Sequence, residues 1–314
     1  MHAIGVDIGG TKIAAGVVDE NGTILAMARR PTEPDDAASI DRAVKDVYLE
    51  LSQDFEIGAI GVAAAGFVDA ARSTVLFAPN IAWRDYPLQD RVRALLDADV
   101  PVVVENDANA AGWAEFRFGA GRDVDDMIML TIGTGLGGAL VVGGRLVRGA
   151  WGVAAELGHM RVVPHGHYCG CGNEGCWEQY ASGSALVRDA QAALITRPER
   201  ALRLLELAGG DPAALEGPHI TEAARQGDPL AIELFAELGR WIGEGSASLA
   251  AVLDPALIVV GGGVGEAGEL LLAPTRHAYE NSLSARGYRP LADFQLAAMG
   301  NDAGIVGAAD LARI

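Results

Sequence analysis

Long apolar runs, cysteines and lysines are all scarce in this chain of 314 residues. No apolar stretch approaches the length of a membrane-spanning helix, so a transmembrane protein is not expected. A strand pattern begins almost at the first residue and no basic leader precedes it, so we expect no secretory signal. The few cysteines are grouped as metal ligands would be, and we therefore expect the protein in the reducing cytoplasm.

Positive charge is also in short supply. The formal net charge is −18, which disfavours nucleic acids and anionic membranes as partners. Of the 24 basic residues only Lys12 and Lys45 are lysines, and Lys12 lies in a glycine-rich turn. Because arginine is used almost everywhere else, we expect that this turn requires a compact point charge.

Three cysteines and one histidine form the most specific motif in the chain. His159, Cys169, Cys171 and Cys176 have the spacing His-x9-Cys-x-Cys-x4-Cys. Thiolates and imidazole are preferred ligands of Zn²⁺, and four protein ligands close a tetrahedral site, so we predict a structural zinc. Two further histidines compete with His159 for the fourth place, but we expect both in a loop; they are His165 and His167.

The pattern strand, glycine turn, strand occurs twice, once at residues 4–18 and once at 127–142. This repetition predicts a duplicated α/β fold with one copy in each half of the chain. Residues 194–218 are rich in Ala, Glu and Pro and are expected to be a surface insertion. Helical spacing is found at residues 40–51, 108–116, 179–193, 229–253 and 303–312, and further strand patterns at 57–64, 100–104 and 256–260.

The glycine turns are candidates for phosphate binding. Gly133-x-Gly135-x-x-Gly138 matches the dinucleotide fingerprint as a string, but a strand pattern follows where that motif requires a helix. We interpret both turns as hairpins whose backbone N–H groups bind the phosphates of a nucleotide, although ordinary tight hairpins would look the same. Asp7 would hold a hydrated Mg²⁺. The other expected nucleotide contacts are Gly9, Gly10, Thr11, Lys12, Thr134, Gly137, Gly262 and Gly263.

Carboxylates cluster near these motifs. Asn106 and Asp107 follow a strand, where Asp107 is either a catalytic group or only a helix cap. Glu156 lies three residues before His159, and Glu178 lies two residues after Cys176. A zinc ion would therefore fix both glutamates as hydrogen-bond acceptors, which suits the neighbouring hydroxyls of a sugar. The alternative is that both are solvated surface residues.

Taken together, these motifs resemble the ROK family of sugar kinases, and within it the bacterial glucokinases. The resemblance extends over essentially the whole chain and implies an actin-like, ribonuclease H-like α/β fold with two domains around a cleft. It also implies transfer of a phosphoryl group from ATP, with Mg²⁺, to the 6-hydroxyl of D-glucose, and a homodimer or homotetramer. The motifs that carry it are Asp7-Ile-Gly-Gly-Thr-Lys12, Thr131–Gly138, Glu156-Leu-Gly-His159, Cys169–Cys176 and Glu178–Gly183.

The resemblance assigns roles to individual residues. Asp107 would be the general base, and His159 would bind zinc with one ring nitrogen and the sugar with the other. The remaining sugar contacts would be Ala65, Gly66, Asn80, Asn106, Glu156 and Glu178. A smaller domain would span residues 1–110, joined by a C-terminal helix at about 303–314, and a larger domain would span 111–302 with the zinc loop 159–176. We expect the cleft to close on glucose.

Several alternatives remain open at this point. Other family members use polyphosphate as donor, or N-acetylmannosamine or fructose as acceptor. A polyphosphate track should be basic, so the acidity of this chain favours ATP. A non-catalytic sugar-sensing regulator is the alternative outside enzymes. Family repressors carry a DNA-binding segment before the Asp-x-Gly-Gly-Thr motif, which begins here at Asp7, and we therefore expect an enzyme.

Overall fold

The computed structural model describes residues 1–96 and 99–314, which form two compact units. The first unit contains Met1–Asp125, Ala139–Ala155 and Ala298–Ile314, and the second contains Asp126–Gly138 and Glu156–Ala297. Among the described residues, no helix has both the length and the apolar character needed to cross a bilayer. The helices are α1 (Ala37–Leu51), α2 (Leu88–Leu95), α3 (Asp107–Phe118), α4 (Gly183–Thr196), α5 (Leu202–Leu207), α6 (Gly217–Arg225), α7 (Pro229–Leu253), α8 (Glu269–Ser282) and α9 (Ala303–Leu311).

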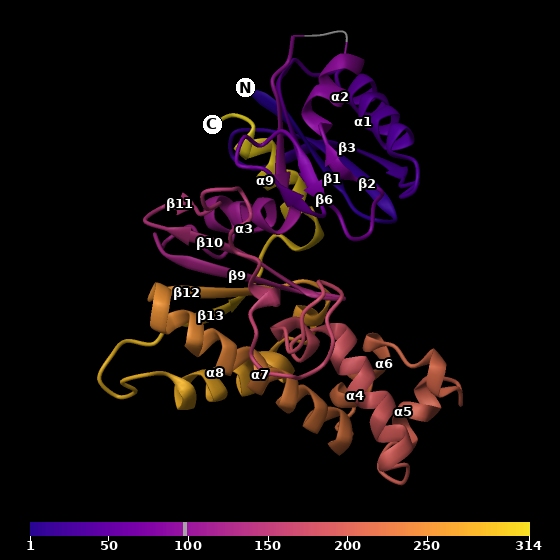
Figure 1. Cartoon of the computed structure of the whole chain (residues 1–314), viewed down its shortest axis with the longest axis vertical. Coiled ribbons are helices and arrows are strands. Elements are labelled where there is room, and N and C mark those ends of the chain that lie inside the picture. Colours follow the sequence, from indigo (N-terminus) through magenta and orange to yellow (C-terminus); the bar gives the residue numbers. More distant parts are fainter. Residues whose placement is uncertain (97–98) are drawn as a thin grey trace. The chain divides into compact units, whose positions relative to one another are not determined.

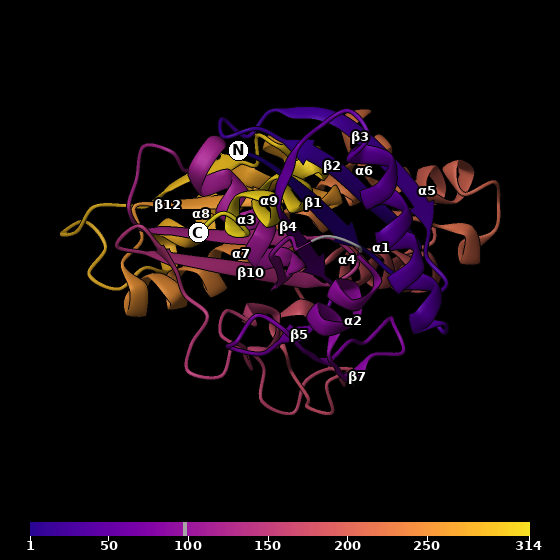
Figure 2. The ribbon, with the colours of Figure 1, turned by 90° about the horizontal axis from the view of Figure 1, so that it is seen from above.

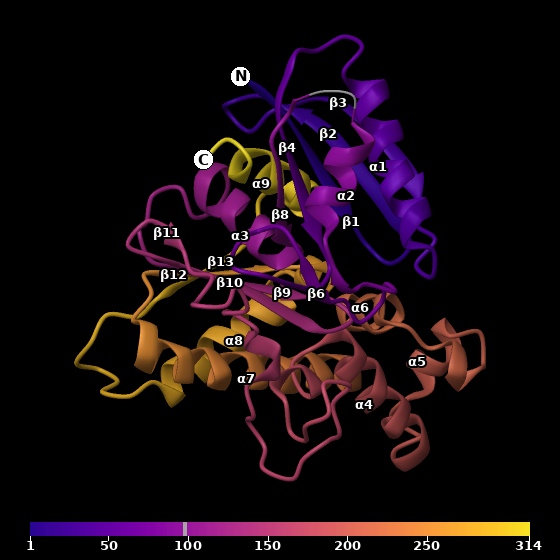
Figure 3. The same cartoon turned by 45° about the horizontal axis from the view of Figure 1, so that its top comes forward.

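The first sheet has the strand order β3-β2-β1-β4-β8. Figure 1 labels its strands β1, β2 and β3, and Figure 3 also labels β4 and β8. β1 pairs with β2 and β2 with β3 in antiparallel fashion, whereas β1, β4 and β8 run parallel. The parallel part therefore has one edge at which three strands end. The bounds are β1 His2–Ile8, β2 Lys12–Val18, β3 Ile24–Pro31, β4 Ile57–Ala64 and β8 Val102–Asn106.

Alternation along β1 builds a core on each face of this sheet. Ile4, Val6 and Ile8 belong to a cluster that includes the buried side of α1. Ala3 belongs to the opposite cluster, which includes Ile305 and other residues of α9. Figure 2 shows α9 beside α3 and over β1 and β4, in agreement with the contacts between these elements. Successive side chains of a strand point to opposite faces of the sheet, so neighbouring residues of β1 contribute to different cores.

The second sheet has the order β11-β10-β9-β12-β13, which reproduces the order of the first sheet. β10 and β11 are antiparallel, while β9, β12 and β13 run parallel. The repeated order confirms the duplication predicted from the glycine turns, and the fold is a duplicated α/β fold. The strands are β9 Met127–Ile132, β10 Leu136–Val142, β11 Arg145–Leu146, β12 Leu257–Gly261 and β13 Asp293–Leu296.

The smaller elements complete the two units. A three-stranded sheet β5-β6-β7 follows β4 in the chain, with β5 Phe67–Val68, β6 Val75–Phe77 and β7 Arg84–Tyr86. Residues 194–218, which the sequence predicts to be a surface insertion, include the end of α4, all of α5 and a short 3-10 helix at Pro212–Ala214. Figure 3 shows α4, α5 and α6 gathered as one group, and they contact one another.

Two glycines of the first sheet allow α9 to lie directly on the backbone of the strands. A Cβ atom added to Gly5 would lie 1.8 Å from the carbonyl oxygen of Ile305, and one added to Gly61 would lie 1.8 Å from that of Ala308. Neither distance leaves room for a methyl group, so both positions require glycine. This close approach fixes the C-terminal helix on β1 and β4.

We predict that Gly61→Ala destabilises the protein by about 1–3 kcal/mol, the usual cost of overpacking. The change should be visible as a lower melting temperature in calorimetry. Gly58→Ala, on the same strand, is the control: its Cβ would meet only the flexible side chain of Met1 and should cost less. Equal losses in the two variants would contradict the close packing of α9.

Candidate functional site

Asp7 and Asp107 lie at the same edge of the first sheet. Asp7 on β1 is level with Ala63 on β4, and Ala63 is level with Glu105 near the end of β8. Because these three strands are parallel, their carboxyl ends meet at one edge, which is where open α/β sheets bind ligands. Asp107 follows two residues after Glu105, as the first residue of α3.

Asn106 fixes the backbone around Asp107. It is the N-cap of α3, and its Oδ1 accepts a hydrogen bond from the N–H of Asn109 at 2.9 Å. Its Nδ2 donates to the carbonyl oxygen of Gly66 at 3.1 Å. Asn106 therefore links the end of β8 with the segment after β4, where Ala65 and Gly66 were expected to line a sugar site.

The two carboxylates at this edge both resist ionisation. Burial raises the pKa of Asp107 above its usual range. Burial, and then the charge of Asp107, raise the pKa of Asp7 to about 6, and Lys12 offsets part of this shift. A divalent cation at this edge would relieve the repulsion, so the pair suits a bound Mg²⁺.

The first glycine turn lies beside this edge. The N–H of Gly9 donates to the carbonyl oxygen of Lys12 at 3.0 Å, and the hydroxyl of Thr32 donates to the carbonyl oxygen of Gly9 at 2.8 Å. Thr11 and Lys12 are exposed. A Cβ added to Gly10 would lie 3.5 Å from the Cβ of Asn80, which places Asn80 next to the turn.

His159, Cys169, Cys171 and Cys176 come together in the second unit. Their ligand atoms all lie within 4.8 Å of one another. Cys169 Sγ is 3.8 Å from His159 Nδ1, and the sulfurs of Cys171 and Cys176 are 3.6 Å apart. A zinc tetrahedron with ordinary Zn–S and Zn–N bonds has edges of about 3.6–3.8 Å. These two distances match such edges, and the four residue types are ones that zinc prefers. His165, by contrast, is 95% exposed and paired with Glu174.

Two glycines allow the chain to wrap around this cluster. Gly172 and Gly175 have φ values of +92° and +77°, in the region that favours glycine. A Cβ on Gly175 would lie 1.6 Å from the carbonyl oxygen of Val163. Burial, together with the hydrogen bond that the thiol donates to Glu178, raises the pKa of Cys169, a cost that a bound cation removes.

Glu178 joins the cluster of His159 and the three cysteines to the second glycine turn. It lies in the short 3-10 helix Trp177–Gln179, directly after Cys176, and its Oε1 is 3.0 Å from Cys169 Sγ. A Cβ added to Gly135 would lie 2.8 Å from Glu178 Oε2. Glu156 precedes the 3-10 helix Leu157–His159 and accepts a hydrogen bond from the His159 N–H through its carbonyl oxygen.

The second glycine turn opens onto a cavity of about 1030 Å³ that lies within the second unit. The N–H of Gly133 donates to the carbonyl oxygen of Gly135, and the N–H of Gly183 donates to that of Gly133. Gly262 has φ +81°, and a Cβ there would lie 2.5 Å from the carbonyl oxygen of Ile132, so the loop after β12 lies against the end of β9. The lining includes Gly133, Thr134, Gly183, Ser184, Arg188, His219, Glu222, Arg225, Gly263 and Val264.

Part of this lining was not identified from the sequence. The start of α4 could have been found from the sequence, because Ser182 is a typical N-cap residue. In the structure its side chain accepts a hydrogen bond from the N–H of Ala185. The part of the lining that α6 contributes has a weaker sequence signal. There Glu216 and His219 cap the helix, with His219 Nδ1 accepting from the N–H of Glu216 at 3.1 Å. That pair departs from the usual Ser/Thr and Glu/Gln pattern.

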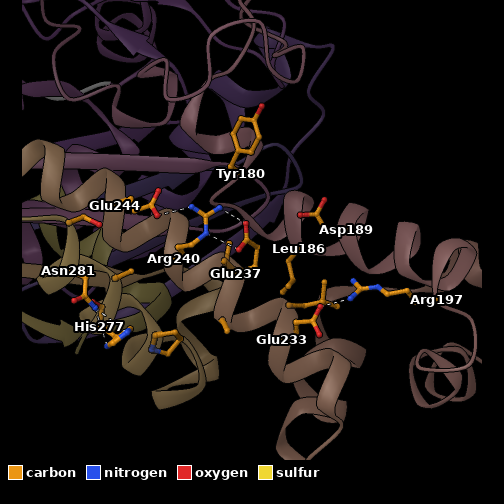
Figure 4. Close-up of a pocket in the computed structure, with 16 residues that line it drawn as sticks. Tyr180, Leu186, Asp189, Arg197, Glu233, Glu237, Arg240, Glu244, His277 and Asn281 are labelled. Atoms are coloured by element: carbon orange, nitrogen blue, oxygen red, sulfur yellow. Dashed lines mark hydrogen bonds and ion pairs between the residues drawn. The ribbon is translucent and has the colours of Figure 1, made fainter.

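A second hollow, of about 700 Å³, lies among α4, α7 and α8 (Figure 4). Its charged groups are paired with one another. Arg240 lies between Glu237 and Glu244, and Arg197 is paired with Glu233. Because both guanidinium groups already bind carboxylates, this hollow is a poor place for a phosphate.

The sequence-predicted residues thus form two groups, each inside one unit. In the first unit they are Asp7, Gly9, Gly10, Thr11, Lys12, Ala65, Gly66, Asn80, Asn106 and Asp107. In the second unit they are Gly133, Thr134, Gly135, Gly137, Glu156, His159, Cys169, Cys171, Cys176, Glu178, Gly262 and Gly263.

Comparison with known proteins agrees with these motifs. The model of the ROK family matches residues 3–314. A glucokinase of Streptomyces coelicolor is 53% identical over 99% of this chain and 97% of its own length. An N-acetylmannosamine kinase of Escherichia fergusonii is 33% identical over 100% and 99% of the two chains. The crystal structure of a ROK family glucokinase from Streptomyces griseus, in complex with glucose and AMPPNP, superposes with a TM-score of 0.89. It is 54% identical and covers 100% of this chain and 99% of that one. The chain belongs to the ROK family.

Proposed function

We propose that this protein is a glucokinase, which transfers the γ-phosphoryl group of ATP to the 6-hydroxyl of D-glucose. The observation that carries the proposal is the position of Glu178. One of its carboxylate oxygens lies against the metal cluster, and the other lies against Gly135 of the second glycine turn. The acid that we propose for sugar binding and the turn that we propose for phosphate binding are thus adjacent, which suits a sugar kinase. The 53% identity to a glucokinase and the 54% identity to a glucose-bound relative support glucose as the acceptor.

In this proposal Asp107 acts as the general base. Its carboxylate accepts the proton of the 6-hydroxyl while that oxygen forms a bond to the γ-phosphorus. The bond from the γ-phosphorus to the bridging oxygen of ADP breaks, and ADP leaves. The raised pKa of Asp107 brings it closer to neutrality, where a general base works best. A Mg²⁺ ion would neutralise charge on the phosphates.

The residues of this chain would divide the remaining work. The resemblance assigns the other hydroxyls of the sugar to Asn106 in the first unit and to Glu156, Glu178 and the Nε2 atom of His159 in the second. It also assigns sugar contacts to Ala65, Gly66 and Asn80. The turn Gly9–Lys12 and the turn Gly133–Gly137 would bind phosphates through backbone N–H groups, with Lys12 adding a cation. The cavity beside Gly263 would hold the nucleoside, since it opens directly from the second turn.

Other phosphoryl acceptors and donors have weaker support than glucose and ATP. The N-acetylmannosamine kinase is 33% identical, against 53% for the glucokinase. Polyphosphate is a long polyanion, and the net charge of −18 disfavours it as a donor.

Three further expectations stay predictions. They are the domain limits at residues 1–110 and 111–302, a homodimer or homotetramer, and a cytoplasmic location.

A panel of glucose, N-acetylmannosamine, mannose and fructose, each with ATP or polyphosphate, tests the function in steady-state kinetics. We expect the highest kcat/KM for glucose with ATP. In the Asp107→Asn variant kcat should fall by about 10² to 10⁴, the range for a lost general base, with little change in glucose affinity. Asparagine can still accept the hydrogen bond that Asp107 receives from the Ala108 N–H at 2.9 Å, so the helix start is preserved. A variant with normal kcat would remove Asp107 from the mechanism.

We propose a structural zinc ion held by His159, Cys169, Cys171 and Cys176. Its chemistry is limited to cross-linking, because four protein ligands leave no open position. By fixing Cys176 and His159 it would hold Glu178 and Glu156, which adjoin them in the chain.

Cys171→Ser should therefore lower the melting temperature and weaken glucose binding together, because the glutamates lose their anchor. Elemental analysis should find about one zinc per chain in the wild-type protein and less in the variant. His165→Ala is the control, since this exposed histidine of the same loop should leave zinc content and glucose binding unchanged. Pure wild-type protein without zinc would refute the proposal.

From the raised pKa of Asp7 we predict how the stability of the folded protein depends on pH. The folded-state pKa of about 6 lies above the ordinary value of 3.8, so ionisation of Asp7 destabilises the folded protein. The cost is absent below pH 3.8, grows between there and pH 6, and is complete above pH 6. In the absence of Mg²⁺, Asp7→Asn should stabilise the protein at pH 8 by up to roughly 3 kcal/mol, and less at pH 5. Chemical denaturation at the two pH values measures this difference, and a variant that is less stable than wild type at pH 8 would contradict it.

A further inference from the structure

Glu105 is a buried carboxylate that the proposed mechanism does not use. It immediately precedes Asn106 and Asp107 and is only 3% exposed. Its Oε1 accepts hydrogen bonds from the N–H of Asn106 and from the side-chain amide of Asn109, both at 3.2 Å. Since these groups belong to the N-cap and first turn of α3, Glu105 holds the turn on which Asp107 lies.

The other oxygen of Glu105 binds two arginines. Arg148 donates to Oε2 from Nε at 2.7 Å, and its Nη2 atom lies 2.7 Å from the same oxygen. The Nε atom of Arg72 lies 3.5 Å from it. One carboxylate is thus shared between the first turn of α3 and two guanidinium groups from other parts of the first unit.

Arg72 ties this cluster to the sheet. It has φ +60°, a conformation that an arginine adopts only when its surroundings hold it there. Its carbonyl oxygen accepts from the N–H of Val104 on β8, and its Nη2 donates to the carbonyl oxygen of Leu311 at the end of α9. The position of Arg72 is therefore fixed from both its backbone and its side chain.

Arg148 begins a closed loop that ends at Ala154, two residues before Glu156. The N–H of Ala154 donates to the carbonyl oxygen of Arg148 at 3.0 Å. Gly152 has φ +89°, and a Cβ there would lie 2.4 Å from the carbonyl oxygen of Val68, so the loop packs on the backbone of the segment that leads to Arg72. Glu156 follows this loop after one further residue, Ala155.

We propose that Glu105 is a positioning residue for the phosphoryl transfer, acting with Arg148 and Arg72. It orients Asp107 through the first turn of α3 and, through Arg148, anchors the loop that leads to Glu156. This inference rests on the proposed function, in which Asp107 is the base and Glu156 binds the sugar. Small displacements of such groups cost rate, because the reacting atoms must be held in a narrow range of positions.

The test is Glu105→Gln compared with Asp310→Asn. Asp310 is a matched control: it is 4% exposed, accepts a hydrogen bond from Trp113 Nε1 at 2.8 Å, and has two arginine partners, Arg117 and Arg313. Its contacts on α3, however, are with Trp113 and Arg117 in the later part of the helix and not with the first turn. Both variants should lose stability, because each leaves arginines without their carboxylate.

We expect kcat per folded molecule to fall by about 10- to 100-fold in Glu105→Gln. KM for ATP should stay within about twofold, since the cavity proposed for the nucleoside lies in the other unit. Asp310→Asn should keep the wild-type kcat per folded molecule. Equal losses of kcat in the two variants, or none in Glu105→Gln, would overturn the positioning role.

A second pair keeps the test decisive if Glu105→Gln does not fold. Arg148→Gln leaves Glu105 paired with Arg72 and should lower kcat by about 10-fold, with KM for ATP again unchanged. Its control, Arg145→Gln, changes an exposed arginine on β11 and should have no effect. An unchanged kcat in Arg148→Gln would refute the role of the cluster. Wild-type protein that fails to phosphorylate glucose would instead refute the proposed function, so the two failures are distinguishable.

Discussion

The parallel register of β1, β4 and β8 is the constraint on which the site in the first unit depends. It brings the end of β1, with Asp7, and the end of β8, with Asn106 and Asp107, to one edge of the sheet. The register is held in turn by α9, whose backbone lies against Gly5 and Gly61. Burial, and then the negative charge of Asp107, raise the pKa of Asp7. Both effects penalise an ionised carboxylate at this edge, and this is the physical reason why the edge suits a cation.

In the second unit the acidic side chains lie in a loop, and they must be held in place without a regular helix or strand. The segment from His159 to Glu178 has little regular secondary structure beyond two short 3-10 helices and isolated bridges. Its ordering comes from the four grouped ligand atoms and from glycines that allow tight turns. As a result Glu178 lies against Gly135, so a group that we propose for sugar binding is next to one that we propose for phosphate binding.

Much of the fold was predictable because its signals are local. The extents of β4 and α7 agree with the predicted ranges 57–64 and 229–253, since each has a regular apolar pattern with clear ends. The glycine turns predicted the duplication, which the repeated strand order confirms. The short strand β13 and the helices α5 and α6 were missed: β13 is four residues long, and the capping pair of α6 is unusual.

The sequence by itself determined the family and the two glycine turns, and it predicted the grouping of His159 with the three cysteines, because each of these depends on residue type at short spacing. The tertiary structure alone decided which separate segments meet. Glu105 has no motif that distinguishes it, yet it binds Arg72 and Arg148 from distant parts of the chain. The helix α6 likewise lines the cavity beside Gly133 and Gly263 only through packing. Contacts of this kind depend on how strands and helices are stacked, and no local pattern encodes that stacking.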